Sequence, residues 1–294
     1  MNHDLSALNT LRAQATEVAL PTGGCDCHAH VFGPYERFPL APSRTYTPPK
    51  STVRSYLKLL DSLGLARGVL VQPSAYGLDN SALLHALQFA PDRLRGVAVV
   101  DGNVSTETLT HLSQCGVRGL RFSRLLDTNG TPRYRNAVDV SAIEQLLPSM
   151  RKTGMHAQLW LGLDDLKDLA PLIRSAGVWF VIDHLGRCDP NRGIEDKSFE
   201  LMCDLVKEGN LWVKLTPYRP SRQFPDYEDM RPFHERLLTI RPDRLLWGSD
   251  WPHVNMTRDI PDTAHLVQLL LRWTGHATSL AQILIENPAR LYGF

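Results

Sequence analysis

The sequence has little net charge and no long apolar run, and each of these absences excludes a class of protein. Its 294 residues carry a formal net charge of +1 without a basic block, which argues against nucleic acid or an anionic membrane as the main partner. No apolar run approaches the ~20 residues that are needed to span a bilayer. Asp4, Arg12 and Glu17 interrupt the N-terminal segment, which therefore does not resemble a signal peptide. We expect a soluble, cytoplasmic protein.

Cysteine is scarce, and its spacing fits neither a disulfide framework nor a metal cluster. The five cysteines are odd in number, which favours reduced thiols. Cys25 and Cys27 lie two residues apart, but no second cysteine pair completes a metal site, so both are interpreted as strand residues. No Gly-x-Gly-x-x-Gly or Walker loop follows any predicted strand, which removes the usual evidence for a nucleotide site.

What the chain does contain is a repeated alternation of short apolar runs and segments with helical spacing. The predicted strands are Cys25–Phe32, Gly68–Gln72, Arg95–Asp101, Val117–Ser123, His156–Gly162, Trp179–His184, Leu211–Thr216 and Arg244–Gly248. The predicted helices are Thr52–Leu63, Asn80–Ala90, Thr106–Cys115, Ser141–Thr153, Leu166–Ala176, Ser198–Glu208, Arg231–Ile240, Thr263–Trp273 and Leu280–Leu284. Continuous rather than alternating apolar runs are typical of parallel strands that are buried on both faces.

Eight such units in one chain predict an α/β fold, a single-domain (β/α)₈ TIM-like barrel over residues 24–294, preceded by an N-terminal extension over residues 1–23. A doubly wound open sheet is the alternative.

Polar side chains stand near the ends of several of these predicted strands. His28 and His30 lie two apart near the end of the first strand, His184 ends the sixth, and Asp250 follows the eighth. In a barrel the carboxyl ends of the strands meet at one mouth, where catalytic residues lie. A structural Asp that caps the next helix is the alternative for Asp250. The combination predicts a catalytic cluster of one carboxylate and three imidazoles.

Two arginines near strand ends suggest an anionic substrate. Arg121 lies near the end of the fourth strand, and Arg219 follows the seventh. Guanidinium groups bind carboxylates in bidentate fashion. A salt bridge at the rim is the alternative for each. Lys214 is interpreted as a structural cation of the seventh strand.

Several motifs together resemble the amidohydrolase superfamily. They are His28-Ala29-His30, Ile182-Asp183-His184, the segment from Trp247 to His253, and Asn287-Pro288-Ala289-Arg290-Leu291-Tyr292. Val31-Phe32-Gly33-Pro34, the segment from Gln72 to Asn80, Arg118-Gly119-Leu120-Arg121-Phe122 and Asp183-His184-Leu185-Gly186-Arg187 resemble, within it, the metal-independent lactonases that act on 2-pyrone-4,6-dicarboxylate and related lactones.

The resemblance implies hydrolysis of a carboxylated lactone, with 2-pyrone-4,6-dicarboxylate as the first candidate. Such a reaction belongs to the degradation of aromatic compounds. Asp250 would be the general base, while His28, His30 and His184 would polarise the carbonyl. Tyr46 and Ser74 would contact substrate carboxylates. No cofactor is expected. Zinc bound by His28, His30, His184 and Asp250 is the alternative, although the fifth strand lacks the histidine that most of the superfamily places at its end.

The chain also departs from the lactonase pattern. A second arginine of that pattern is matched by Asp127, so Arg124, Arg133 or Arg135 is expected to bind the second carboxylate. A lactonase for sugar-acid lactones or muconolactones, a zinc-dependent decarboxylase and a non-catalytic binding protein are the remaining alternatives.

Overall fold

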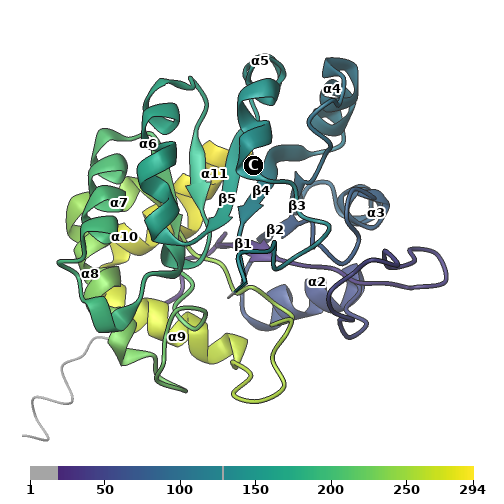
Figure 1. Ribbon diagram of the computed structural model, residues 1–294. Helices are drawn as coiled ribbons and strands as arrows, with labels where there is room; N and C mark the ends of the chain where they lie inside the picture. The colour runs from purple at the N-terminus through teal and green to yellow at the C-terminus, as the bar shows by residue number, and fades with distance from the viewer. Residues whose placement is uncertain (1–18, 128) are drawn as a thin grey trace, which may run out of the picture.

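Eight short parallel strands form the centre of the computed structural model, which describes residues 19–127 and 129–294 (Figure 1). They pair in chain order from β1 to β8. Their bounds are Cys25–Ala29 (β1), Arg67–Val71 (β2), Leu94–Ala98 (β3), Val117–Arg124 (β4), His156–Leu161 (β5), Phe180–Ile182 (β6), Leu211–Lys214 (β7) and Leu245–Leu246 (β8). This arrangement confirms the predicted barrel.

The seam between β8 and β1 closes the barrel. Cys27 N donates to Trp247 O at 2.8 Å, and Asp250 N donates to His28 O at 2.7 Å. Gly248 is required at this seam, because a Cβ there would lie 2.5 Å from the Cβ of His28. The open-sheet alternative is therefore wrong.

The helices surround the strands and cover their outer faces (Figure 1). Their bounds are Val53–Ser62 (α2), Ser81–Phe89 (α3), Thr106–Gln114 (α4), Ile143–Thr153 (α5), Leu166–Ser175 (α6), Lys197–Glu208 (α7), Arg231–Ile240 (α8), Thr263–Thr274 (α9), Ala277–Ala281 (α10) and Asn287–Tyr292 (α11). Side-chain caps fix several starts: Ser105 accepts from the backbone of Thr108 at α4, and Asp262 accepts from that of Ala264 at α9. The last predicted helix, Leu280–Leu284, is helical in the structure, but it covers the end of α10 and the start of a π-helical turn, Gln282–Glu286, that leads into α11.

The barrel interior is filled at its amino-terminal end. Alternate strand residues, among them Cys25, Cys27 and Trp212, form a buried cluster together with Tyr292 of α11. This confirms that both cysteines are strand residues. Because Tyr292 and its neighbours occupy this end, the opposite mouth of the barrel is where a site can form.

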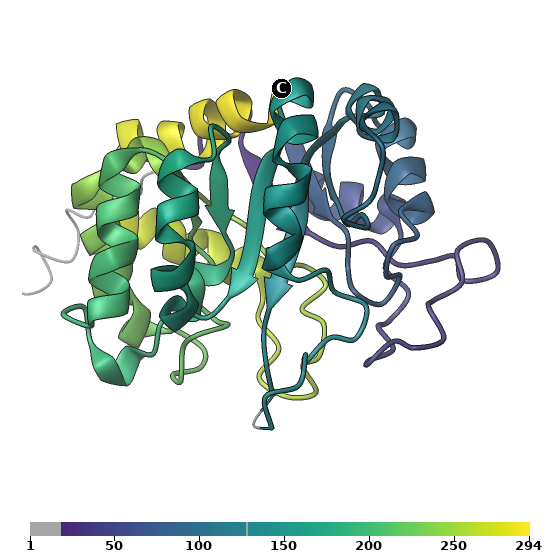
Figure 2. The same ribbon diagram turned by 45° about the horizontal axis from the view of Figure 1, so that its top comes forward.

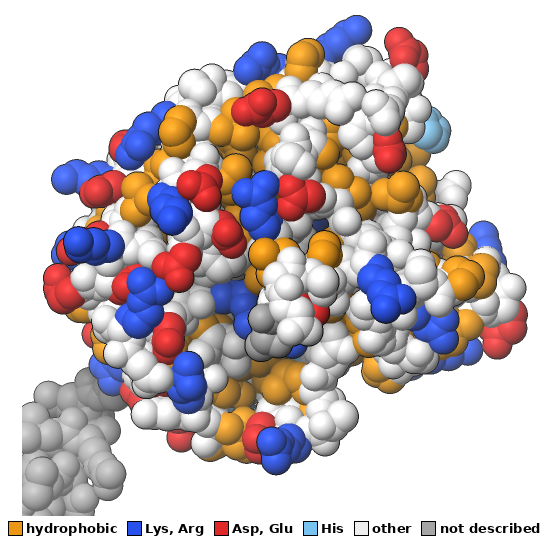
Figure 3. All heavy atoms as spheres, viewed as in Figure 1, with side chains coloured by type: hydrophobic (Ala, Val, Ile, Leu, Met, Phe, Trp, Pro, Cys, Tyr) orange, Lys and Arg blue, Asp and Glu red, His pale blue; other side chains and the backbone are white. Residues whose placement is uncertain are grey.

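The strands point toward that opposite mouth, where long loops project (Figure 2). The loop after β4 and the loop after β8 extend side by side from this end in Figure 2. In the space-filling view, basic side chains are visible in a hollow near the centre (Figure 3). In the described part of the chain, no helix is both long and apolar enough to cross a membrane. The N-terminal extension predicted over residues 1–23 lies mostly outside the described residues and stays a prediction.

Candidate active site

The four side chains predicted to be catalytic lie together at the carboxyl ends of the strands. The Oδ1 atom of Asp250 lies 3.3 Å from His30 Nε2 and 3.7 Å from His28 Nε2. Its Oδ2 atom lies 3.7 Å from His184 Nε2. All four residues are buried. The sequence therefore placed the right residue types in one cluster.

Irregular backbone presents these side chains to the centre of the barrel. Asp250 (φ 57°) and His184 (φ 53°) adopt left-handed conformations, which are unfavourable for residues other than glycine. Such strain persists only where surrounding contacts fix it, and it is common at functional sites. At Asp250 the fixing contact is the bond to His28 O, and the neighbouring His30 N donates to Trp251 O at 2.8 Å.

The two oxygens of Asp250 have different surroundings. Oδ2 accepts from Tyr218 Oη at 2.7 Å and from Arg219 Nε at 2.6 Å. Oδ1 is left to face His28 and His30. Burial alone would raise the pKa of Asp250, but the Arg219 cation and the hydrogen-bonding contact with His30 hold it well below its usual value. Asp250 is therefore a carboxylate with one oxygen fixed and the other directed into the site.

A second buried carboxylate, Asp183, connects His28 to the cations Lys214 and Arg121. Its oxygens lie 3.3 Å from Lys214 Nζ, 3.3 Å from Arg121 Nη2 and 3.2 Å from His28 Nδ1. Gln158 connects to the same group, because it donates to Asp183 at 3.1 Å and accepts from Lys214 at 2.8 Å. Burial would raise the pKa of Asp183, yet Lys214 and His28 lower it well below its usual value. This network fixes the His28 ring through its Nδ1 atom.

The sequence prediction did not include Asp183 and assigned Lys214 only a structural role. Asp183 was detectable, because a carboxylate directly before His184 at the end of a buried strand carries the same signal as Asp250. Tyr218 and Gln158 had no such signal, because their contacts depend on which strands become neighbours in space.

The imidazoles of His28 and His184 are neutral at pH 7. Burial lowers the pKa of His184 to about 4 and that of His28 well below its usual value. His28 Nε2 and His184 Nδ1 are buried and have no hydrogen-bond partner among the described residues. His30 Nδ1 contacts Val71 O at 2.7 Å, which directs Nε2 toward Asp250. His28 Nε2 and His184 Nδ1 are therefore the ring nitrogens of this cluster that lack a partner among the described residues.

The residues predicted to bind substrate carboxylates border the cluster, with one exception. Arg121 is buried and lies over the Trp160 ring at 4.3 Å, and Arg219 contacts Asp250 as described. Ser74 Oγ is buried without a partner among the described residues. Burial raises the pKa of Tyr46 to about 12, so its phenol stays protonated and can donate a hydrogen bond.

The exception is Arg124. Its Nη2 atom lies 3.0 Å from Asp139 Oδ1 in a partly exposed ion pair, so the structure does not bring Arg124 into the cluster. Asp127, which matches the missing family arginine, accepts from the backbone of Asn129 and Thr131 in a turn. Arg124 is a poor replacement because it donates through both Nε and Nη2 to Asp139, at 3.3 Å and 3.0 Å, outside the cluster.

A metal ion would find suitable ligands in this cluster. The ligand atoms of His28, His30 and Asp250 all lie within 4.8 Å of one another. Imidazole nitrogen and carboxylate oxygen are the donors zinc prefers, and the unpartnered Nε2 of His28 is one of them. The donor set therefore fits zinc, while Arg219, Lys214 and Arg121 supply positive charge around it.

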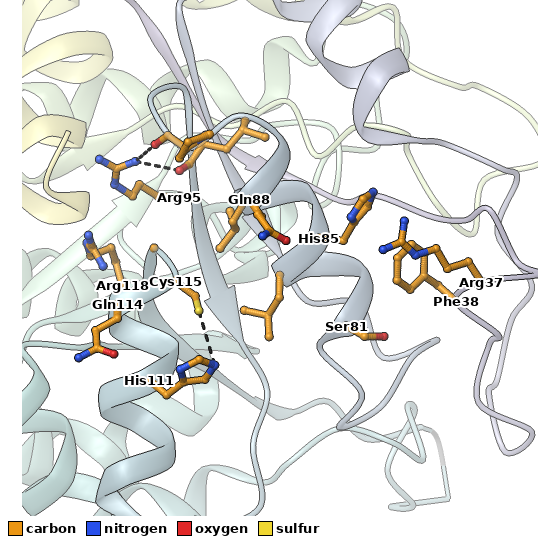
Figure 4. A pocket seen from close by; sticks show the side chains of 15 residues that line it. Arg37, Phe38, Ser81, His85, Gln88, Arg95, His111, Gln114, Cys115 and Arg118 are labelled. Carbon is orange, nitrogen blue, oxygen red and sulfur yellow. Dashed lines mark hydrogen bonds between the residues drawn. The ribbon is translucent and has the colours of Figure 1, made fainter.

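A groove lies outside the barrel, between α3 and α4 (Figure 4). It encloses about 810 Å³, and its lining includes Arg37, Arg118, His111 and Cys115. His111 Nε2 and Cys115 Sγ lie 3.7 Å apart within it. None of the four clustered residues lines this groove, so the catalytic candidates belong to the barrel mouth.

Comparisons with known proteins agree with the geometry. A model of the family described as Amidohydrolase matches residues 25–294. The chain is 36% identical to a 4-sulfomuconolactone hydrolase of Rhizobium radiobacter, covering 96% of this chain and 94% of the relative. It is 35% identical to a 2-pyrone-4,6-dicarboxylate hydrolase of Comamonas testosteroni, covering 93% and 91%. A solved structure of a probable 2-pyrone-4,6-dicarboxylic acid hydrolase from Acinetobacter baumannii, with citric acid bound, superposes with a TM-score of 0.78 at 29% identity, covering 93% of this chain and 100% of that one.

Proposed function

The chain belongs to the amidohydrolase family, and we propose that it is a lactonase. Its substrate is an anionic lactone, and the first candidate is 2-pyrone-4,6-dicarboxylate. The observation that carries the proposal is the asymmetry of Asp250. Its Oδ2 atom is held by Tyr218 and Arg219, while its Oδ1 atom faces the imidazoles of His28 and His30. A carboxylate held in this way is suited to activate water beside a polarised carbonyl.

Asp250 acts as the base and then as the acid. Its Oδ1 atom takes a proton from water as the water oxygen bonds to the lactone carbonyl carbon. The ring C–O bond then breaks, and the proton passes from Asp250 to the departing ring oxygen. The product is the ring-opened acid, and Asp250 returns to its ionised form. General acid–base catalysis of this kind contributes about 10²–10⁴-fold.

The imidazoles stabilise the negative charge that develops on the carbonyl oxygen. Lys214 Nζ and Asp183 Oδ1 both lie near His28 Nδ1, at 3.3 Å and 3.2 Å. In the tautomer in which Nδ1 accepts from Lys214, the ring proton lies on Nε2, directed into the site. A donor placed for the oxyanion contributes roughly 3–4 kcal/mol to the barrier. His30 and His184 border the same space.

The positive charge of the site supports an anionic substrate. Arg121 and Arg219 lie on either side of the cluster, through their contacts to Asp183 and Asp250. Each guanidinium retains N–H donors for a carboxylate. The citric acid bound to the related structure from Acinetobacter baumannii is itself a polycarboxylate.

We also propose that the reaction needs no resident metal, because Asp250 is already neutralised by Arg219 at 2.6 Å and three cations surround the donor set. If zinc were bound by His28, His30 and Asp250, it would polarise the carbonyl. Activity is expected to survive dialysis against a strong chelator, with less than stoichiometric metal by elemental analysis. Loss of activity that zinc alone restores would contradict this proposal. We place the enzyme in the cytoplasm, where its thiols stay reduced.

The substrate is tested by a kinetic panel. The wild-type enzyme would be assayed with 2-pyrone-4,6-dicarboxylate, 4-sulfomuconolactone, a muconolactone and aldonolactones. We expect the highest kcat/KM with the pyrone dicarboxylate. The muconolactone class is the second candidate, because the relative at 36% identity is a 4-sulfomuconolactone hydrolase. Absence of hydrolysis across the whole panel would refute the lactonase assignment.

A further inference from the structure

A line of hydrogen-bonding side chains leads from Asp250 to the start of α9. Tyr218 Oη lies 2.7 Å from Asp250 Oδ2, and His253 Nδ1 lies 3.2 Å from the same phenol oxygen. At the other side of the imidazole, His253 Nε2 lies 3.1 Å from Thr263 Oγ1. All four residues are buried. The proposed reaction steps involve neither His253 nor Thr263.

The direction of the hydrogen bonds at Tyr218 follows from the carboxylate. An ionised carboxylate only accepts hydrogen bonds, so the single proton of the Tyr218 hydroxyl points at Asp250. Burial and the charge of Asp250 raise the pKa of Tyr218 well above its usual value, so this proton stays on the phenol. The Tyr218 oxygen can then only accept from His253, and Nδ1 of that imidazole must carry a proton.

The direction of the hydrogen bond at Thr263 follows from the imidazole. Burial lowers the pKa of His253 to about 4, so the ring carries one proton at pH 7. With that proton on Nδ1, the Nε2 atom accepts a hydrogen bond from the Thr263 hydroxyl. A doubly protonated ring would still donate from Nδ1, so the bond to Tyr218 does not depend on this pKa. At pH 7 three hydrogen bonds thus run in one direction, from Thr263 to Asp250, and each strengthens the next.

The opposite tautomer of His253 would weaken the hold on Asp250. A proton on Nε2 would leave Nδ1 without one, and Nδ1 would then accept from Tyr218 and compete with Asp250 for its only proton. Of Tyr218 and Arg219, only Arg219 would still donate to Oδ2, through Nε at 2.6 Å. The tautomer of His253 therefore determines how firmly the carboxylate is held.

Backbone contacts fix His253 at its place in this line. Its N–H donates to Asp250 O at 2.9 Å, and its φ of 59° is a left-handed conformation, which persists in a histidine only where surrounding contacts fix it. Thr263 is the first residue of α9, and Asp262 caps that helix. The contact between His253 and Thr263 closes the base of the loop 254–262, which projects from the mouth of the barrel (Figure 2).

We propose that His253 is a positioning residue for the base: its Nδ1–H directs the Tyr218 proton to Asp250 Oδ2 and so keeps Oδ1 facing the site. Thr263 holds the imidazole in the required tautomer. The proposal rests on the proposed function, in which Asp250 is the base. His253 acts through Tyr218 and contacts neither the water nor the lactone, so its replacement should change kcat rather than KM.

Two amide variants separate the roles of the two ring nitrogens. The amide nitrogen of asparagine takes about the place of Nδ1, and that of glutamine takes about the place of Nε2. With the preferred lactone, His253→Asn should keep kcat within about threefold of the wild type, because it still donates to Tyr218. His253→Gln should lower kcat about tenfold and change KM less than about threefold, as for the loss of one hydrogen bond. Equal losses in the two variants, or a larger loss in His253→Asn, would overturn the proposal.

Thr263→Val and Thr263→Ser form a matched pair at the start of α9. Only serine keeps the hydroxyl, so Thr263→Val should lower kcat about three- to tenfold and Thr263→Ser should stay within about twofold of the wild type. Equal kcat values in this pair would contradict the proposed line of hydrogen bonds. His234→Gln is the control outside the site, because His234 is also buried and its Nε2 lies 3.1 Å from the Thr274 hydroxyl. This control should keep kcat within about twofold.

NMR of the ring nitrogens separates this proposal from the proposed function, because it requires no turnover. In ¹⁵N-histidine spectra of the wild type at pH 7.5, the signals that His253→Asn lacks belong to His253; if that variant does not fold, through-bond correlation to the His253 backbone assigns them. We expect a protonated Nδ1 and an unprotonated Nε2. A proton on Nε2 instead would overturn the proposal, even in an enzyme that opens lactones. The expected tautomer in a protein that opens no lactone would support the hydrogen bonds and refute the lactonase.

Discussion

At the scale of single residues, the site contains two buried carboxylates with different tasks. Asp183 has both oxygens surrounded by Lys214, Arg121, Gln158 and His28, so it serves to hold other groups in place. Asp250 has one oxygen directed at the imidazoles. The difference in surroundings, rather than in residue type, is why we propose Asp250 and not Asp183 as the base.

Tyr218 is the residue that most directly positions Asp250. Its hydroxyl donates to Oδ2 at 2.7 Å and lies 3.2 Å from His253 Nδ1. We expect Tyr218→Phe to lower kcat about tenfold while KM changes less than about threefold, because the carboxylate loses one of its two fixing donors but the substrate loses no contact. Steady-state kinetics check this, with Tyr227→Phe, whose ring lies 6.4 Å from that of Tyr218, as the control. An increase in KM alone would show that Tyr218 binds substrate instead.

At the scale of secondary structure, the seam between β1 and β8 brings together residues that we propose to be catalytic. Asp26 accepts from Ser249 N at 2.8 Å, from Ser249 Oγ at 2.6 Å and from Tyr56 Oη at 3.0 Å. These bonds attach the segment before Asp250 to the strand that carries His28. The close approach at Gly248 then sets the spacing between the two residues.

The sequence was sufficient for the order, type and starting points of most elements. Apolar runs give the starts of β4, β5 and β7 at Val117, His156 and Leu211, because burial on both faces leaves a clear signature. The ends of the strands are less predictable. The sixth and eighth predicted strands continue to His184 and Gly248, whereas β6 ends at Ile182 and β8 at Leu246.

The strands end early because the backbone leaves the ladder to present His184 and Asp250 in left-handed conformations. Such conformations result from tertiary contacts and have no sequence signature in a histidine or aspartate. The partners of Lys214 and Arg124 were unpredictable for a related reason. Ion pairing depends on the neighbours that the folded barrel supplies, Asp183 for the first and Asp139 for the second.

At the scale of the whole molecule, buried histidines make the fold sensitive to acid. Burial lowers the pKa of His156 and of His234 to about 3, and those of His184 and His253 to about 4. The unfolded chain binds these protons near pH 6.5, whereas the folded protein does not. Above pH 6.5 these histidines therefore do not reduce the free energy of unfolding. As the pH falls toward their pKa values in the folded protein, the free energy of unfolding decreases, by about 2 kcal/mol for each histidine at pH 5.

Urea unfolding between pH 7.5 and pH 5 checks this expectation. His234 lies in α8 near Thr274, outside the site. On acidification to pH 5, His234→Gln should lose less unfolding free energy than the wild type, by about 2 kcal/mol, the contribution of one histidine. Burial raises the pKa of Asp26 to about 6, so the folded protein binds a proton at Asp26 more readily than the unfolded chain does. Protonation of Asp26 between about pH 6 and 4 therefore stabilises the fold and offsets part of the loss caused by the histidines. A stability that is flat or rises on acidification would contradict the histidine account.

The most direct test of the central claim is the turnover and ligand affinity of Asp250→Asn. The amide keeps the size of the side chain but cannot accept a proton from water. We expect lactone turnover to fall by at least about 10²-fold. The dissociation constant for pyridine-2,4-dicarboxylate, a stable ring of similar shape, measured by calorimetry, should stay within about tenfold of the wild-type value. A variant that retains turnover, or one that loses affinity as severely as activity, would contradict the role of Asp250 as the base.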